Sequence, residues 1–228
     1  MTTPLRFGLL LFPRLTQLDM TGPFEVFSRV PGATTHLVWK TTDPVRSDTG
    51  LSMLPDTRFA DCPPLDVVCV PGGPGVAALM EDEEVLAFLR AQAATARYVT
   101  SVCTGALVLA AAGLLKGRQA TTHWASHDFL STLGAVPVQG RVVRDGRFVT
   151  GGGVTAGIDF ALTLVAEMVS PEVAQAIQLQ IEYAPAPPFD AGSPATAPAG
   201  VLAAAKARGA GMRAEREALV ARVAARLG

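Results

Sequence analysis

Two hydrophobic periods alternate along the first 170 residues of the chain. Short continuous apolar runs, typical of strands that are buried on both faces, occupy residues 7–12, 37–40, 66–70 and 98–102. Segments with apolar residues three and four positions apart, typical of helices that cover a core, occupy residues 19–29, 82–94 and 104–112. This alternation of strands and helices predicts an α/β fold with a mostly parallel central sheet.

Less regular elements follow residue 112. We expect a short helical segment over 123–133 and a hairpin over 142–149, where Asp145-Gly146 is a strong two-residue turn signal. Two further helices are expected, one over 155–168 with Thr155 as its cap, and one from Pro171 to about Tyr183.

The chain changes character after Tyr183. Residues 184–199 (APAPPFDAGSPATAPA) are rich in proline and almost free of charge, which predicts an extended connector or arm. Residues 201–227 predict an Ala/Arg-rich helix that is weakened near Gly209 and Gly211. Because these two pieces are too small for a second core, we predict one domain over 1–183, to which 184–228 adds an arm and a terminal helix.

Composition narrows the functional classes. Hydrophobic residues make up 49% of the 228 positions and charged residues 17%, so a sizeable core is available. The net charge is −1 and the basic residues are dispersed, which disfavours nucleic acid and anionic membranes as partners. No apolar run is long enough to span a bilayer. The three cysteines are odd in number and unpaired in spacing, which favours a reducing, cytoplasmic location and no structural metal site.

Cys103 is the first candidate for chemistry, because it stands where the strand YVTSV meets the helix TGALVLAA. Ligands of open α/β sheets bind at the carboxyl ends of the strands. The helix dipole at this position predicts a lowered pKa and a populated thiolate. The small residues of 104–106 also allow a tight turn like the nucleophile elbow of α/β hydrolases. The alternative is a buried core cysteine, which is our expectation for Cys69, whereas Cys62 lies in a loop.

The segment 71–75 (PGGPG) follows another predicted strand. Glycines there let backbone N–H groups approach a ligand, as an oxyanion hole requires, although a sharp loop without a ligand would use the same residues. The spacing does not match the dinucleotide-binding fingerprint, so NAD is disfavoured.

Asp19 and His123 are candidates for proton transfer. Asp19 begins the first predicted helix, where it is either a helix cap or, if the sheet brings the first and fourth predicted strands together, a proton donor beside Cys103. In the second case the neighbouring thiolate would raise the carboxyl pKa. His123 begins a helical segment and is either a base for Cys103 or a structural residue.

Five segments together resemble the DJ-1/PfpI superfamily: LDMTGPFEVF (18–27), PGGPG (71–75), SVCTGALVLAAAGLL (101–115), ATTHW (120–124) and GGGVTAGIDFAL (151–162). Within the superfamily the chain is similar to the branch of bacterial isocyanide hydratases. The Pro-rich stretch at 178–198 and the shorter Asp at position 19, where protease-like and chaperone-like relatives place Glu, carry that resemblance. A regulator branch with an AraC-type DNA-binding domain shares several motifs, but fewer than 50 residues follow Ile181.

The resemblance implies a flavodoxin-like three-layer sandwich without cofactor or metal. It also implies a homodimer with each site near the interface, to which 184–228 would contribute. The substrates would be a small isocyanide and water. The Cys103 thiolate would attack the isocyanide carbon, Asp19 would act as general acid and base, and an N-substituted formamide would leave through a thioimidate intermediate.

The resemblance also suggests supporting residues. The backbone N–H groups of Gly73 and Thr104 would stabilise developing charge, and the Thr104 side chain would lie near the carboxyl or the substrate. His123 becomes a supporting residue. Gly152 and Val154 would lie beside the elbow, where the glycine run either lets the following helix shift or only makes a tight connection. Two alternatives stay open: another cysteine enzyme of glyoxalase or hydrolase type, and a non-enzymatic redox sensor that uses Cys103.

Overall fold

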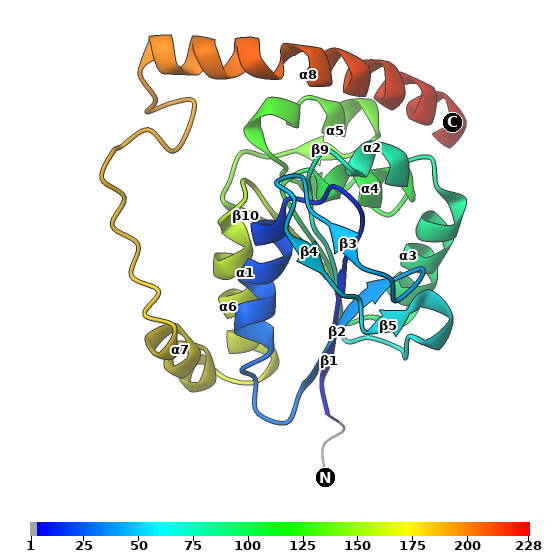
Figure 1. The fold of residues 1–228 in the computed structure, drawn as a ribbon, viewed down its shortest axis with the longest axis vertical. Helices are drawn as coiled ribbons and strands as arrows, with labels where there is room; N and C mark the ends of the chain where they lie inside the picture. The colour runs from blue at the N-terminus through cyan, green and yellow to red at the C-terminus, as the bar shows by residue number, and fades with distance from the viewer. Residues whose placement is uncertain (1–3) are drawn as a thin grey trace.

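A seven-stranded sheet forms the centre of the molecule, which the computed structural model describes over residues 4–228 (Figure 1). The strand order is β10-β11-β7-β6-β1-β2-β5, and all neighbours are parallel except β10 and β11. The strands are β1 (Arg6–Leu10), β2 (Thr34–Trp39), β5 (Thr57–Arg58), β6 (Val67–Val70), β7 (Tyr98–Val102), β10 (Val142–Asp145) and β11 (Phe148–Gly151).

Helices cover both faces of the sheet and make the fold a three-layer sandwich (Figure 1). One layer contains α1 (Gln17–Phe27), α6 (Ala156–Met168) and α7 (Pro171–Gln180). The other contains α2 (Val76–Leu79), α3 (Glu83–Thr95), α4 (Gly105–Ala111) and α5 (Phe129–Thr132). This arrangement confirms the predicted α/β sandwich with a mostly parallel sheet.

The core lies on both faces of β1, β6 and β7, because these strands are buried on both sides, and β7 buries the hydroxyls of Thr100 and Ser101 as well. Leu9, Val67 and Val99 are completely buried. On the α1 side, Phe7 stacks on Phe27 with 4.4 Å between ring centroids. Burial of this kind releases roughly 25 cal/mol per Å² of apolar surface, which makes the central strands the rigid frame from which the connecting loops extend.

The hydrophobic pattern located the main elements but missed the small ones. The hairpin forms as expected around Gly146, whose φ is 59°. The expected helix over 123–133 is instead a 3₁₀ turn, η2 (Trp124–Ser126), followed by α5. The remaining short elements were not predicted: β3 (Val45–Arg46), β4 (Ser52–Met53), β5, η1 (Phe59–Asp61), β8 (Gln119–Ala120), β9 (Val136–Pro137) and α2. Segments of two to four residues are too short to show a period.

The C-terminal helix α8 (Ala199–Leu227) continues unbroken through Gly209 and Gly211, which confirms the predicted helix, whereas its local weakening there stays a prediction. A helical glycine costs only about 1 kcal/mol relative to Ala, and the surrounding Ala and Arg residues favour the helix. The helix crosses the end of the domain at which α5 and α2 lie (Figure 1). In the described residues, no helix has both the length and the apolar composition that crossing a membrane requires.

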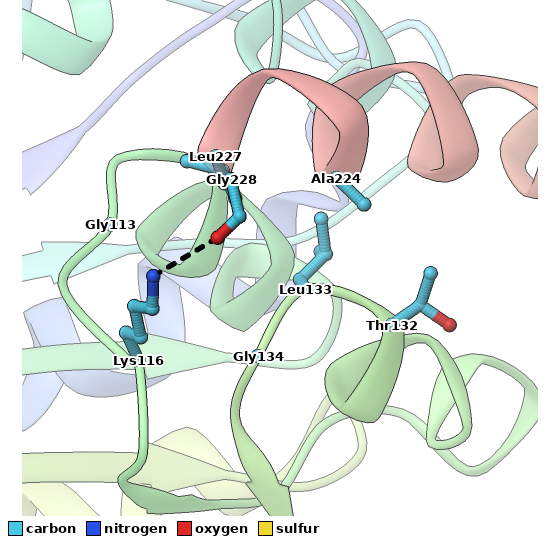
Figure 2. A pocket seen from close by; sticks show the side chains of 8 residues that line it. All are labelled: Gly113, Lys116, Thr132, Leu133, Gly134, Ala224, Leu227 and Gly228. Atoms are coloured by element: carbon cyan, nitrogen blue, oxygen red, sulfur yellow. Dashed lines mark hydrogen bonds between the residues drawn. The ribbon is translucent and has the colours of Figure 1, made fainter.

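The second half of α8 packs on the domain. Leu219, Val220 and Val223 are buried there. At its end, Figure 2 shows Gly228 and Leu227 against the loops that contain Lys116 and Leu133, and the Lys116 amine donates a 3.2 Å hydrogen bond to the Gly228 carbonyl. The boundary that we predicted at residue 183 stays a prediction, but α8 contacts the same body as the rest of the chain.

Candidate active site

Three connections meet at the carboxyl ends of β1, β6 and β7. Asp19 lies on α1 after β1, the glycine turn 71–75 follows β6, and Cys103 follows β7. Because β6 lies between β1 and β7, the first and fourth predicted strands do not pair with each other. Their connections nevertheless converge, because both reach the turn after β6.

Cys103 occupies a strained turn between β7 and α4. Its φ is 54°, in the left-handed region that residues other than glycine rarely adopt. Its N–H donates to the Gly151 carbonyl at 3.1 Å, which ties the elbow to the end of β11. A Cβ atom at Gly105 would lie 2.0 Å from the Val70 carbonyl oxygen, so only glycine lets α4 begin this close to β6. The tight strand-to-helix turn predicted from the sequence is confirmed.

The Asp19 carboxyl lies beside the sulfur of Cys103. The Asp19 side chain is completely buried, and its Oδ2 accepts a 2.8 Å hydrogen bond from the Gly72 N–H. The carboxyl lies close enough to the Cys103 thiol for each group to shift the pKa of the other. Its other oxygen, Oδ1, has no hydrogen-bond partner in the described residues. The N-cap of α1 is Thr16, so the alternative of Asp19 as a helix cap is wrong.

Burial dominates the acidity of both groups. It raises the pKa of Asp19 to about 7, while the Gly72 N–H and the thiol hydrogen bond lower that pKa. The raised pKa agrees with the sequence expectation. We expected a neighbouring thiolate to be its cause, whereas burial raises the pKa and the Cys103 thiol lowers it. Burial and then Asp19 raise the pKa of the Cys103 thiol above its ordinary value, against the opposing hydrogen bonds of Thr104.

The lowered Cys103 pKa that we expected from the helix dipole is therefore wrong. Helix α4 has seven residues, and Cys103 is only 6% exposed, so desolvation of the thiolate outweighs the dipole. Two neighbouring acids with raised pKa values titrate as a pair, which passes from a net charge of 0 to −1 near neutral pH as its first proton is lost.

The expected backbone donors differ in availability. The Thr104 N–H approaches the Cys103 sulfur and lowers its pKa, as an anion-stabilising donor should. The Gly73 N–H instead donates to the Thr104 hydroxyl at 3.0 Å, so it is already occupied. Thr104 thus contacts the glycine turn rather than the carboxyl. A Cβ atom at Gly72 would lie 2.7 Å from the Asp19 Oδ2, which explains the glycine there and adds Gly72 to the site.

His123 does not reach Cys103 through any hydrogen bond of the described residues. Its Nδ1 accepts the Ala125 N–H at 3.3 Å, and burial followed by the nearby Arg216 lowers its pKa. The neighbouring Thr122, which we did not predict, donates its hydroxyl to the Cys103 carbonyl at 2.7 Å. His123 therefore has the position of a neutral, structural residue and not of a base.

Gly152 and Val154 follow the carbonyl that Cys103 contacts, so the glycine run lies beside the elbow as the resemblance implied. The buried Gly152 donates its N–H to the Arg141 carbonyl at 2.9 Å, and a Cβ atom on it would lie 3.1 Å from the Gly140 oxygen. Val154 is half-buried against the core.

The other two cysteines lie apart from the site's hydrogen bonds. Burial raises the pKa of Cys69 to about 12 and that of Cys62 to about 11, so both are thiols at neutral pH. Cys69 is completely buried, as expected of a core residue. Over residues 4–228, no group of three or more His, Cys, Asp or Glu side chains is placed to hold a metal ion.

A family profile, curated sequences and solved structures all relate this chain to DJ-1/PfpI proteins. The DJ-1/PfpI family profile matches residues 6–167. An isonitrile hydratase from Pseudomonas putida is 61% identical over 223 residues, which is 98% of each chain. A glutathione-independent glyoxalase from Caenorhabditis elegans is 29% identical over 58% of this chain and 71% of its own. The crystal structure of a ThiJ/PfpI family protein from Pseudomonas syringae superposes with a TM-score of 0.93 and 45% identity, covering 96% of this chain and 91% of that one.

The buried carboxyl makes a prediction about stability. Between the ordinary pKa of 3.8 and the folded value of about 7, native Asp19 retains a proton that the unfolded chain has released. The free energy of unfolding therefore falls as pH rises through this window. The Asp19→Asn variant has no carboxyl to titrate and lacks this loss. In urea denaturation, its free energy of unfolding relative to that of the wild type should therefore rise by up to roughly 3 kcal/mol from pH 4 to pH 7.5. Asp43→Asn, at an exposed carboxyl, is the control, and parallel profiles for wild type and Asp19→Asn would contradict the raised pKa.

Proposed function

The chain belongs to the DJ-1/PfpI family, and we propose that it is an isocyanide hydratase, a hydro-lyase that adds water to R–N≡C and forms the formamide R–NH–CHO. Isonitrile and isocyanide are two names for the same functional group, so the full-length relative at 61% identity supports this reaction. The observation that carries the proposal is the buried Asp19 carboxyl, with a pKa of about 7, next to the Cys103 thiol, whose pKa it shifts. That pair contains the nucleophile and the acid that the reaction requires.

The first step adds sulfur and a proton to one carbon atom. The reactive form of the pair holds a Cys103 thiolate and a protonated Asp19. The thiolate attacks the terminal isocyanide carbon, and the Asp19 proton transfers to that carbon, which gives Cys–S–CH=N–R and an Asp19 carboxylate. A carboxyl with a pKa near 7 suits this transfer, because it is protonated often enough to donate and acidic enough to release the proton.

The second half of the reaction uses the carboxylate as a base. It accepts a proton from water as the hydroxyl adds to the thioimidate carbon, and the proton passes to nitrogen, giving Cys–S–CH(OH)–NH–R. Loss of the hydroxyl proton to Asp19 then expels the thiolate and leaves R–NH–CHO. The pair returns to its starting form, and every proton is accounted for without a cofactor.

The other predicted residues take supporting roles. The Thr104 N–H stabilises charge on the sulfur, while the Thr104 hydroxyl holds the glycine turn through Gly73. We propose that the Gly73 N–H becomes available to the substrate only if that bond breaks. His123 supports the loop that contacts the Cys103 carbonyl, and Gly152 and Val154 allow the start of α6 to shift when the sulfur loses its charge.

We further propose a cytoplasmic homodimer. All three cysteines are free thiols, which suits a reducing compartment. The arm and its surroundings expose large apolar side chains, including Leu179 at 81% and Phe189 at 78%. Apolar side chains of this size gather at protein–protein contacts, so a second copy of the chain would cover them.

Cys103→Ser should abolish formamide production and leave the fold intact, because a hydroxyl at this position is a far poorer nucleophile near neutral pH. Purified wild type and variant would be incubated with cyclohexyl isocyanide, and the formamide measured by chromatography. Wild-type activity in the variant would exclude the covalent mechanism. Parallel incubations with methylglyoxal and with peroxide test the glyoxalase and redox-sensor alternatives, and turnover of methylglyoxal without formamide would exclude the hydratase.

Asp19→Asn should lower the single-turnover rate by at least about a hundredfold, because an amide has no proton to transfer to the isocyanide carbon. Asp19→Glu should retain part of the activity, since the longer side chain keeps the acid but displaces it. Rapid-quench measurement of the first turnover reports this step directly. A near-normal first turnover in Asp19→Asn would assign proton transfer to another group.

Removal of residues 184–228 should weaken the dimer, because it removes the exposed apolar arm. Analytical ultracentrifugation over a concentration series gives the dissociation constant. Since the truncation also strips α8 from the domain, Phe189→Asp in the full chain is the sharper variant, and it should weaken association by placing a charge in the contact. An unchanged dimer in Phe189→Asp would place the interface elsewhere, and a monomeric wild type would contradict the proposal altogether.

A further inference from the structure

The buried stripe of α8 contains one charged residue. Arg216, Leu219, Val220 and Val223 lie on the same face of the helix, and all four are buried, Arg216 with only 9% exposure. A guanidinium that is removed from water loses hydration, which other interactions must replace. A helix that docks through leucine and valine has no packing need for such a group.

Arg216 differs from the other arginines of α8 in its partners. Arg213 pairs with Asp128, and Arg222 and Arg226 pair with Glu81, all at exposed positions. Arg216 has no carboxylate partner in the described residues. Its contacts are a 3.0 Å hydrogen bond from Nη1 to the Ser126 hydroxyl and a 3.7 Å contact from Nη2 to the Met212 sulfur, and its buried Nε is unpartnered.

The position of Arg216 connects it to the cysteine elbow. Ser126 donates its backbone N–H to the His123 carbonyl at 2.8 Å, and the adjacent Thr122 hydroxyl contacts the Cys103 carbonyl at 2.7 Å. One short segment, 122–126, therefore bridges Cys103 and Arg216. This agrees with the path of α8 over the end of the domain in Figure 1.

A cavity of about 280 Å³ lies between α8 and the connections that follow β1 and β6. On the α8 side it is lined by Arg216, Met212 and Glu215, and on the domain side by Arg14, after β1, and Pro74, in the glycine turn. These loops are connected, because the Gly75 N–H donates to the Arg14 carbonyl at 3.1 Å. The guanidinium thus borders the space next to the turn on which the Asp19 carboxyl rests.

Arg216 is the buried one among the charged residues that line this cavity, since Arg14 and Glu215 are both exposed. Asp19 on α1 faces Cys103, and Asp48 adds a further negative charge that raises the Asp19 pKa. His123 is kept neutral, because burial and Arg216 lower its pKa. Burial lowers the pKa of Arg216 itself, and the Cys103 thiolate raises it. An interaction between two charges is reciprocal, so the guanidinium also favours the thiolate.

We propose that Arg216 is a positioning residue that supplies the counter-charge of the Asp19–Cys103 pair, so that α8 forms part of the active site. It acts through the pair and does not touch the reacting atoms. Its positive charge favours the singly ionised pair and opposes part of the rise in the Cys103 pKa that burial and Asp19 produce. The proposal rests on the Cys103 chemistry described above, but it concerns the ionisation of the pair and not the identity of the substrate.

The test is the pH dependence of Cys103 alkylation by iodoacetamide, followed by peptide mass spectrometry. Arg216→Met and Arg216→Gln should raise the midpoint by about one pH unit, which is about tenfold slower labelling below the midpoint. Arg216→Lys, which keeps the charge, should have a midpoint close to that of the wild type. Arg213→Met removes an exposed charge one turn away and should leave the midpoint unchanged.

Unchanged midpoints in folded Arg216→Met and Arg216→Gln, checked by circular dichroism, would overturn the proposal, as would an equal shift in Arg213→Met. A second measurement uses ¹⁵N-labelled wild type, in which the Arg216 ¹⁵Nε resonance is assigned by its loss in Arg216→Lys. Alkylation of Cys103 removes the negative charge from the sulfur and should move this resonance. A resonance that does not move also overturns the proposal. Because labelling needs no isocyanide, absence of formamide formation would contradict the proposed function and leave this result intact.

Discussion

The Asp19 carboxyl and the Cys103 thiol are buried side by side, and much of the surrounding architecture follows from holding one negative charge there. The carboxyl receives a backbone N–H from Gly72, and the sulfur receives one from Thr104. These donors approach so closely that side chains are excluded at two points, Gly72 and Gly105, where an added Cβ atom would meet a carboxylate or a carbonyl oxygen. The left-handed backbone of Cys103 is part of the same requirement, because it turns the sulfur toward Asp19.

The sequence predicted the parts of the site that depend on local pattern. Continuous apolar runs identify β1, β6 and β7, and small residues after Cys103 predict the elbow. The spatial order of the strands is not encoded in any period, so the meeting of Asp19 and Cys103 could only be stated as a condition. The direction of the Cys103 pKa was wrong for a related reason. A dipole can be read from a helix start, but burial depends on which distant segments cover the sulfur.

Residues 184–228 also show that a local pattern does not predict which side chains become buried. Their composition predicted an arm and a helix, but not which face of that helix packs on the domain. An arginine in an Ala/Arg-rich helix is ordinarily solvated, so nothing local distinguishes Arg216 from Arg213 or Arg222. Only the packing of α8 against the 122–126 segment separates the buried guanidinium from the exposed ones.

Burial of the pair also fits the chemistry of an isocyanide better than a freely ionised thiol would. The isocyanide carbon must receive a nucleophile and a proton, and the substrate supplies no acidic proton of its own. A thiol with an ordinary low-pKa neighbour would leave its proton on sulfur and a carboxylate that cannot protonate carbon. Raising the Asp19 pKa to about 7 keeps a proton on the carboxyl over part of the neutral range, where it can be donated to carbon. Burial raises the pKa of the Cys103 thiol as well, so a cation near the sulfur is what favours the thiolate. The same carboxyl then serves as the base when water arrives.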